Sequence, residues 1–209
     1  MPTQSDMSPA IGLSYTTRIP PDIFTEFERL VAAEGLGLHV EQREEDGPFA
    51  AFEWLVPTVV VLFIAKAYFD GFLKEMGKDH YALLKAGLKS LYFRLLGPSA
   101  PKTVVVSAGG KTSTDQPYSL LFSIFAEADE GARFKLLLRR SASESEYDAT
   151  VEAFLAFLEA YYNGSLAPEI VAELKSTTFV GRTILLVYNP ALERVQPIDP
   201  VPSRRPKGA

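Results

Sequence analysis

Residues 55–65 of the chain read Leu55-Val56-Pro57-Thr58-Val59-Val60-Val61-Leu62-Phe63-Ile64-Ala65, and no charged side chain interrupts them. A helix that is apolar on every side must be buried, either inside a protein or inside a membrane. The residues that follow, through Leu73, become one-sided and basic. We therefore predict a helix near residues 56–76 that is the central buried element of the fold. The alternatives are a helix that faces a partner and a segment that inserts into a bilayer.

The length of this apolar run argues against a transmembrane span. A span needs about 20 predominantly apolar residues, and extending the run to residues 54–72 brings in Pro57, Lys66 and Asp70. A charge near the centre of a span costs about 2.5–3.5 kcal/mol, whereas each Leu, Ile, Phe or Val returns only about 0.3–0.6 kcal/mol. The balance for insertion is close to zero, so the sequence favours a core element.

Composition indicates a chain that can bury a hydrophobic core. The chain has 209 residues, of which 47% are hydrophobic and 22% are charged, as in ordinary globular domains. We predict one domain over residues 10–197, with flexible tails at residues 1–9 and 198–209. The N-terminal residues have neither the basic nor the apolar region of a signal peptide, which favours a cytoplasmic location.

The absence of cysteine and the net charge exclude several function classes. With no cysteine in the chain, disulfides, cysteine-ligated metals and cysteine nucleophiles are impossible. A net charge of −5 gives no general attraction to nucleic acid, which makes a nucleic-acid partner an unfavourable hypothesis.

Hydrophobic periodicity predicts an α+β fold. Alternating patterns predict strands at residues 11–18, 36–40, 103–107, 119–126, 133–139, 183–188 and 193–196. Helical spacing predicts helices near residues 21–34, 79–96, 143–162 and 168–175, and Ser143 with Glu146 fits a capping box. Because the strands cluster apart from the helices, we predict a mostly antiparallel sheet of about five to seven strands packed against helices.

The motifs that could carry chemistry are weak. Residues 107–112 end in Gly-Gly-Lys-Thr, but a phosphate-binding loop needs glycine where Val105 stands. The chain has two histidines. His39 falls on the polar phase of a strand, and His80 lies with Glu75 and Asp79 beside a possible helix break, where we expect polar surface residues. We predict no metal site, no cofactor and no catalytic residues.

A basic stripe is the most suggestive surface feature of the sequence. It consists of Lys74, Lys78, Tyr81, Lys85 and Lys89, which share one side if the helices are roughly continuous. Such a stripe is either a solvated helix face or a surface that meets an anion or a protein partner.

These observations favour a non-catalytic protein–protein interaction module or a subunit of a cytoplasmic complex, in which self-association or a protein partner is expected. One alternative is an enzyme of unrecognised type with a site near the helix break at residues 75–80. A further alternative is a membrane-perturbing effector that uses the apolar segment at residues 49–73.

Overall fold

The computed structural model describes residues 9–44, 58–72, 78–97, 100, 117–177 and 181–199. These residues form one seven-stranded sheet with helices, which confirms the α+β class. The strands are β1 (Ile11–Thr16), β2 (Leu38–Arg43), β3 (Val60–Ile64), β4 (Tyr118–Glu127), β5 (Arg133–Arg139), β6 (Thr183–Asn189) and β7 (Arg194–Ile198). The α-helices are α1 (Thr25–Val31), α3 (Lys78–Leu96), α4 (Glu144–Tyr162) and α5 (Pro168–Ser176). Short helices of other kinds are η1 (Pro21–Ile23), η2 (Tyr68–Phe72) and η4 (Asp129–Gly131).

The sheet is mixed, so the prediction of a mostly antiparallel sheet is wrong. The strand order is β2-β1-β3-β4-β5-β6-β7. The neighbours β1/β2, β3/β4 and β5/β6 are parallel, while β1/β3, β4/β5 and β6/β7 are antiparallel. Parallel neighbours need a long crossover. Here α1, α3 and α4 with α5 lie between the two strands of each parallel pair along the chain.

Residues 60–64 of the apolar run form a central strand, so the predicted buried helix near residues 56–76 is wrong over these residues. Val60–Ile64 is β3, and it lies between β1 and β4. Its Val60, Leu62 and Ile64 side chains are fully buried. A short apolar run fits a buried strand as well as a buried helix, and the β-branched residues here favour the strand. The prediction of burial is confirmed, and the prediction of helix is not.

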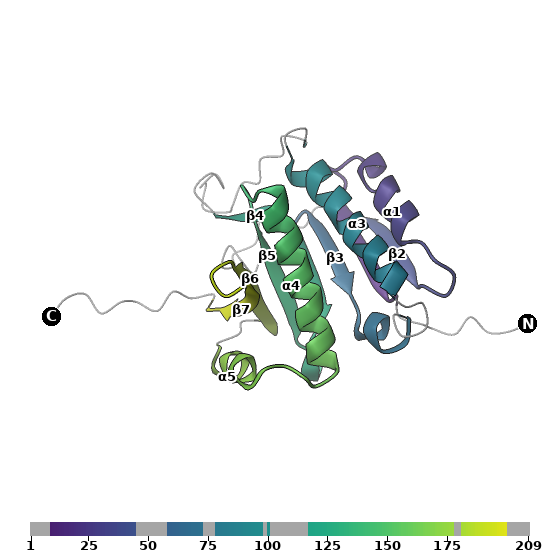
Figure 1. Cartoon of the computed structure of the whole chain (residues 1–209). Helices are drawn as coiled ribbons and strands as arrows, with labels where there is room; N and C mark the ends of the chain where they lie inside the picture. The colour runs from purple at the N-terminus through teal and green to yellow at the C-terminus, as the bar shows by residue number, and fades with distance from the viewer. Residues whose placement is uncertain are drawn as a thin grey trace, which may run out of the picture.

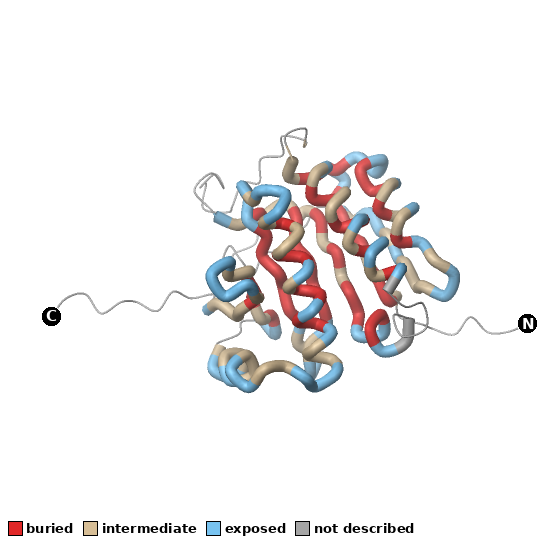
Figure 2. The backbone as a smooth tube through the Cα atoms, in the orientation of Figure 1, coloured by how far each residue is buried: buried red, intermediate tan, exposed pale blue. Residues whose placement is uncertain are grey.

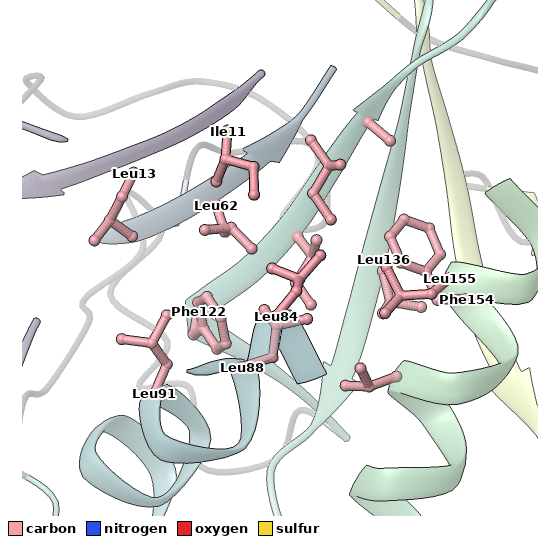
Figure 3. Packing of buried hydrophobic residues seen from close by; sticks show 14 of the residues in the cluster. Ile11, Leu13, Leu62, Leu84, Leu88, Leu91, Phe122, Leu136, Phe154 and Leu155 are labelled. Carbon is pink, nitrogen blue, oxygen red and sulfur yellow. The ribbon is translucent and has the colours of Figure 1, made fainter. Parts of the chain in front are cut away.

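The main core lies between one face of the sheet and the helices α1, α3 and α4. Figure 1 shows these helices side by side over that face, and Figure 2 shows buried residues concentrated in the central strands. The core joins side chains from the strands to side chains from α3 and α4 (Figure 3), among them Leu13, Leu62, Phe122, Leu136, Leu84, Leu88, Phe154 and Leu155.

One predicted helix cap is confirmed in place, and several predicted segments lie outside the described residues. Ser143 is the N-cap of α4, and its hydroxyl accepts a hydrogen bond from the Glu146 amide. Asp79 lies in the first turn of α3. The strand predicted at residues 103–107, the loop at 107–112 and most of both predicted tails lie outside the described residues.

Candidate functional site

Two lysines of the predicted basic stripe connect α3 to α4. Lys85 forms an ion pair with Glu152, and the Lys89 ammonium lies 2.7 Å from a Glu144 carboxylate oxygen and 3.0 Å from an Asp148 oxygen. The hydrogen bonds that the Lys89 ammonium donates to these two carboxylates raise the pKa of Lys89. An external anion would therefore compete with carboxylates of the chain itself. The partner-facing role of the stripe stays a prediction.

The other members of the stripe are placed less completely. Lys74 lies outside the described residues, and Lys78 is the first residue of α3. Tyr81 is half-buried, with the Lys85 nitrogen 5.8 Å from its ring centre. Burial raises the pKa of Tyr81 to about 12. Tyr81 is therefore partly a packing residue of α3.

His80 is buried, which corrects the expectation of a polar surface residue at this position. Only 2% of His80 is exposed. Its Nε2 lies 2.8 Å from the Val31 carbonyl oxygen and its Nδ1 lies 3.2 Å from the Tyr68 hydroxyl. Because a carbonyl oxygen can only accept, the His80 Nε2–H donates to the Val31 carbonyl, while Nδ1 faces the Tyr68 hydroxyl. His80 thus links α1, η2 and α3. Glu75, the third member of the predicted cluster, lies outside the described residues.

A second buried polar group lies on the sheet face opposite the helices. Lys135 of β5 is 1% exposed, and its ammonium lies 5.4 Å from the ring centre of Phe125 on the neighbouring strand. Burial, together with the nearby Arg133 guanidinium, lowers the pKa of Lys135 to about 8. The sequence signal for this lysine was the strand alternation. It puts Arg133, Lys135 and Leu137 on one side of β5, so that the lysine shares this side with the core residue Leu137.

The strand β2 forms one end of the sheet (Figure 1), and three of its six residues are exposed. Among the described strands it pairs only with β1. His39 and Glu41 point to the face opposite α1, α3 and α4, with side chains that are 61% and 54% exposed. Leu38 and Val40, on the helix face, are only partly buried. The exposure of His39 confirms its predicted place on the polar phase of a strand.

Hydrogen-bond phase decides which backbone groups of β2 are free for a further strand. The Ile11 amide donates to the Gly37 carbonyl at 3.1 Å. Backbone groups of successive residues in a strand point to opposite edges, so Gly37, His39 and Glu41 direct theirs toward β1. Val40 and Gln42 consequently direct both N–H and C=O away from the sheet.

The opposite end of the sheet is closed by its sequence. Pro197 in β7 pairs with Leu186 of β6, and proline has no N–H for a further strand. Arg194 at the start of β7 forms two hydrogen bonds with the Glu173 carboxylate of α5, at 2.7 and 2.9 Å. The helix α5 is therefore held against this end.

Sequence reasoning missed the β2 edge as a site. The alternation from Leu36 to Val40 did predict a strand, but the position of that strand at the sheet end depends on the order β2-β1-β3. That order is set by contacts between distant segments. Within the described residues, no three histidine, aspartate or glutamate side chains gather as metal ligands. The described helices include none with the length and apolar character needed to cross a bilayer.

No protein family model, curated protein or solved structure matches the chain.

Proposed function

We propose that the protein is a non-catalytic interaction module, or a subunit of a protein complex, that accepts an extended strand of another chain on β2. The open edge of β2 carries this proposal. Val40 and Gln42 offer backbone donors and acceptors that no described strand uses. An edge of this kind binds an added strand through main-chain hydrogen bonds, while alternate side chains supply selectivity.

The environment of β2 supports strand addition on both faces. On the helix face, Leu38 and Val40 pack against the core but remain partly exposed, so an added strand would bury more of their apolar surface. On the opposite face, His39 and Glu41 offer polar partners for side chains of the added strand. The other sheet end lacks these properties because Pro197 interrupts its donors.

The test compares Gln42→Pro with Gln42→Thr. Gln42 is exposed, and its N–H points away from β1, so proline removes a donor of the open edge without removing a bond of the existing sheet. Threonine at the same position keeps the N–H and favours strand structure. Both variants and the wild-type protein are used to capture partners from an extract of the cells that make the protein.

Strand addition predicts that a partner is retained by the wild-type protein and by Gln42→Thr but lost by Gln42→Pro. Hydrogen exchange then checks the geometry, because the amides of Val40 and Gln42 should become protected in the complex. Equal capture by all three proteins, with no protection at these amides, contradicts the proposal.

A further inference from the structure

We propose that the strand accepted by β2 is β2 of a second copy of this chain, paired antiparallel about a twofold axis that passes through Val40. This inference rests on the proposed function and names its partner. It joins two sheets end to end through the strands at the right-hand end of the sheet in Figure 1.

Backbone phase fits this register. Val40 directs its N–H and C=O outward, so two Val40 residues on the axis exchange both hydrogen bonds as an antiparallel hydrogen-bonded pair. Leu38 and Gln42 are the neighbouring residues whose backbone groups also point away from β1. In this register the Gln42 N–H of one copy lies opposite the Leu38 carbonyl of the other. The Leu38 amide already donates to the Leu36 carbonyl at 3.0 Å, so Leu38 contributes its carbonyl alone.

Side-chain chemistry also fits this register. With Val40 on the axis, His39 of each copy lies opposite Glu41 of the other, in the non-hydrogen-bonded pairs where side chains approach most closely. An imidazole and a carboxylate are complementary cross-strand partners. Within one chain the two groups already lie 3.6 Å apart and are largely exposed. The dimer would therefore gather two imidazoles and two carboxylates on the face opposite α1, α3 and α4.

Other registers are worse. An axis at Glu41 places two glutamates opposite each other, which is destabilising. An axis at His39 brings Arg43 opposite Gly35, whose φ of +81° ends the extended conformation. An axis at Gln42 brings Val40 opposite Glu44, beyond the end of β2 at Arg43. The Val40 register alone keeps all pairs from Leu38 to Gln42 within β2.

Symmetry limits the assembly to two copies. A twofold contact uses the same surface on both subunits and closes on itself. The β7 end of each sheet is blunted by Pro197, so the joined sheet does not continue through a second edge.

The test measures the dimer dissociation constant of the full chain by sedimentation equilibrium. His39→Lys and His39→Glu form a matched pair of variants. Position 39 is exposed, and in the proposed dimer it lies opposite Glu41 of the other copy, next to the twofold axis. His39→Lys places an ammonium opposite Glu41, so we expect dimerisation to tighten several-fold. His39→Glu places two carboxylates opposite each other, so we expect it to weaken about tenfold. The double variant His39→Glu/Glu41→Lys restores opposite charges and should recover dimerisation.

Gln42→Pro should abolish the dimer, whereas Gln42→Thr should keep it. A dimer that is unchanged in His39→Glu and in Gln42→Pro uses another surface and overturns this inference. A wild-type protein that stays monomeric at millimolar concentration also overturns it. If the protein is monomeric, the proposed function is tested by capture of a different protein. It stands if Gln42→Pro loses that partner and Gln42→Thr retains it. It is contradicted if neither substitution changes the capture.

Discussion

The outer strands at the two ends of the sheet differ in how accessible their edges are to a further strand. At the β2 end, no described strand pairs with the outward backbone groups of Val40 and Gln42, and the side chains of His39 and Glu41 are more than half exposed. At the β7 end, Pro197 removes a donor and α5 is held by the Arg194–Glu173 pair. Both strands are short, with six residues in β2 and five in β7.

The contrast shows that edge accessibility is set residue by residue. An exposed strand edge is a site for aggregation unless proline, charge or a covering element blunts it. The β7 end has a proline, and α5 is joined to it by the Arg194–Glu173 pair. Among the described residues, the β2 end carries the polar side chains His39 and Glu41 on one face, and such side chains favour pairing with a complementary strand and oppose pairing with a mismatched one.

The largest expected effect separates the inward and outward residues of β2 itself. Glu41 directs its N–H toward β1, so Glu41→Pro removes a ladder bond and leaves an acceptor of β1 unsatisfied. We expect the free energy of unfolding to fall by about 3 kcal/mol or more. Gln42→Pro, one residue further, should cost less than about 1 kcal/mol because its N–H faces outward. Urea unfolding of the two variants measures both values.

Glu41→Thr controls for loss of the carboxylate and should remain close to the wild-type protein. Similar losses of unfolding free energy in Glu41→Pro and Gln42→Pro would contradict the assignment of inward and outward residues in β2. That assignment is derived from the Ile11–Gly37 hydrogen bond.

The second prediction concerns Lys135, in the half of the sheet that ends at β7. Its folded pKa of about 8 lies below the ordinary value of 10.5, so between these pH values the unfolded chain binds the extra proton. The free energy of unfolding therefore rises with pH across this window, by about 3 kcal/mol from this one group. Lys135→Met should flatten that rise. Denaturant unfolding at several pH values from 7 to 10.5 measures the difference between the two profiles.

Lys175→Met is the matched control, because Lys175 is exposed on α5, and this variant should keep the wild-type pH profile. Tyrosines that lose protons at high pH act equally in both proteins and cancel in the comparison. Parallel profiles for wild type and Lys135→Met would contradict the account of a desolvated amine in this half of the sheet.

Local sequence signals predicted much of the fold. The helix from residue 144 to 162 has a cap at Ser143 and a regular apolar face, and both were readable because they depend on residues three or four apart. The run around Val60 was misread because a short apolar segment has no period that separates helix from strand. Its β-branched residues were the available signal.

Tertiary pairing explains what the sequence could not reveal about the site. Lys85 and Lys89 formed a basic stripe in the sequence, but their carboxylate partners, Glu152, Glu144 and Asp148, lie on a helix some 60 residues away. Likewise, β2 lies at the sheet end because β3 pairs with the far side of β1. No local pattern encodes such contacts.

The smallest expected effect tests whether the ion pair at the β7 end contributes to closing it. The Arg194 and Glu173 side chains are 26% and 39% exposed, so solvent screens their attraction, and Arg194→Gln should cost less than about 1 kcal/mol of unfolding free energy. The loss should shrink further in high salt, and Glu173→Gln should give a similar value. Because Ile170 and Leu174 of α5 still pack against the core and Pro197 still lacks a donor, we expect sedimentation of Arg194→Gln to match the wild-type protein. Larger assemblies in this variant would show that the ion pair, rather than the proline, keeps the β7 end closed.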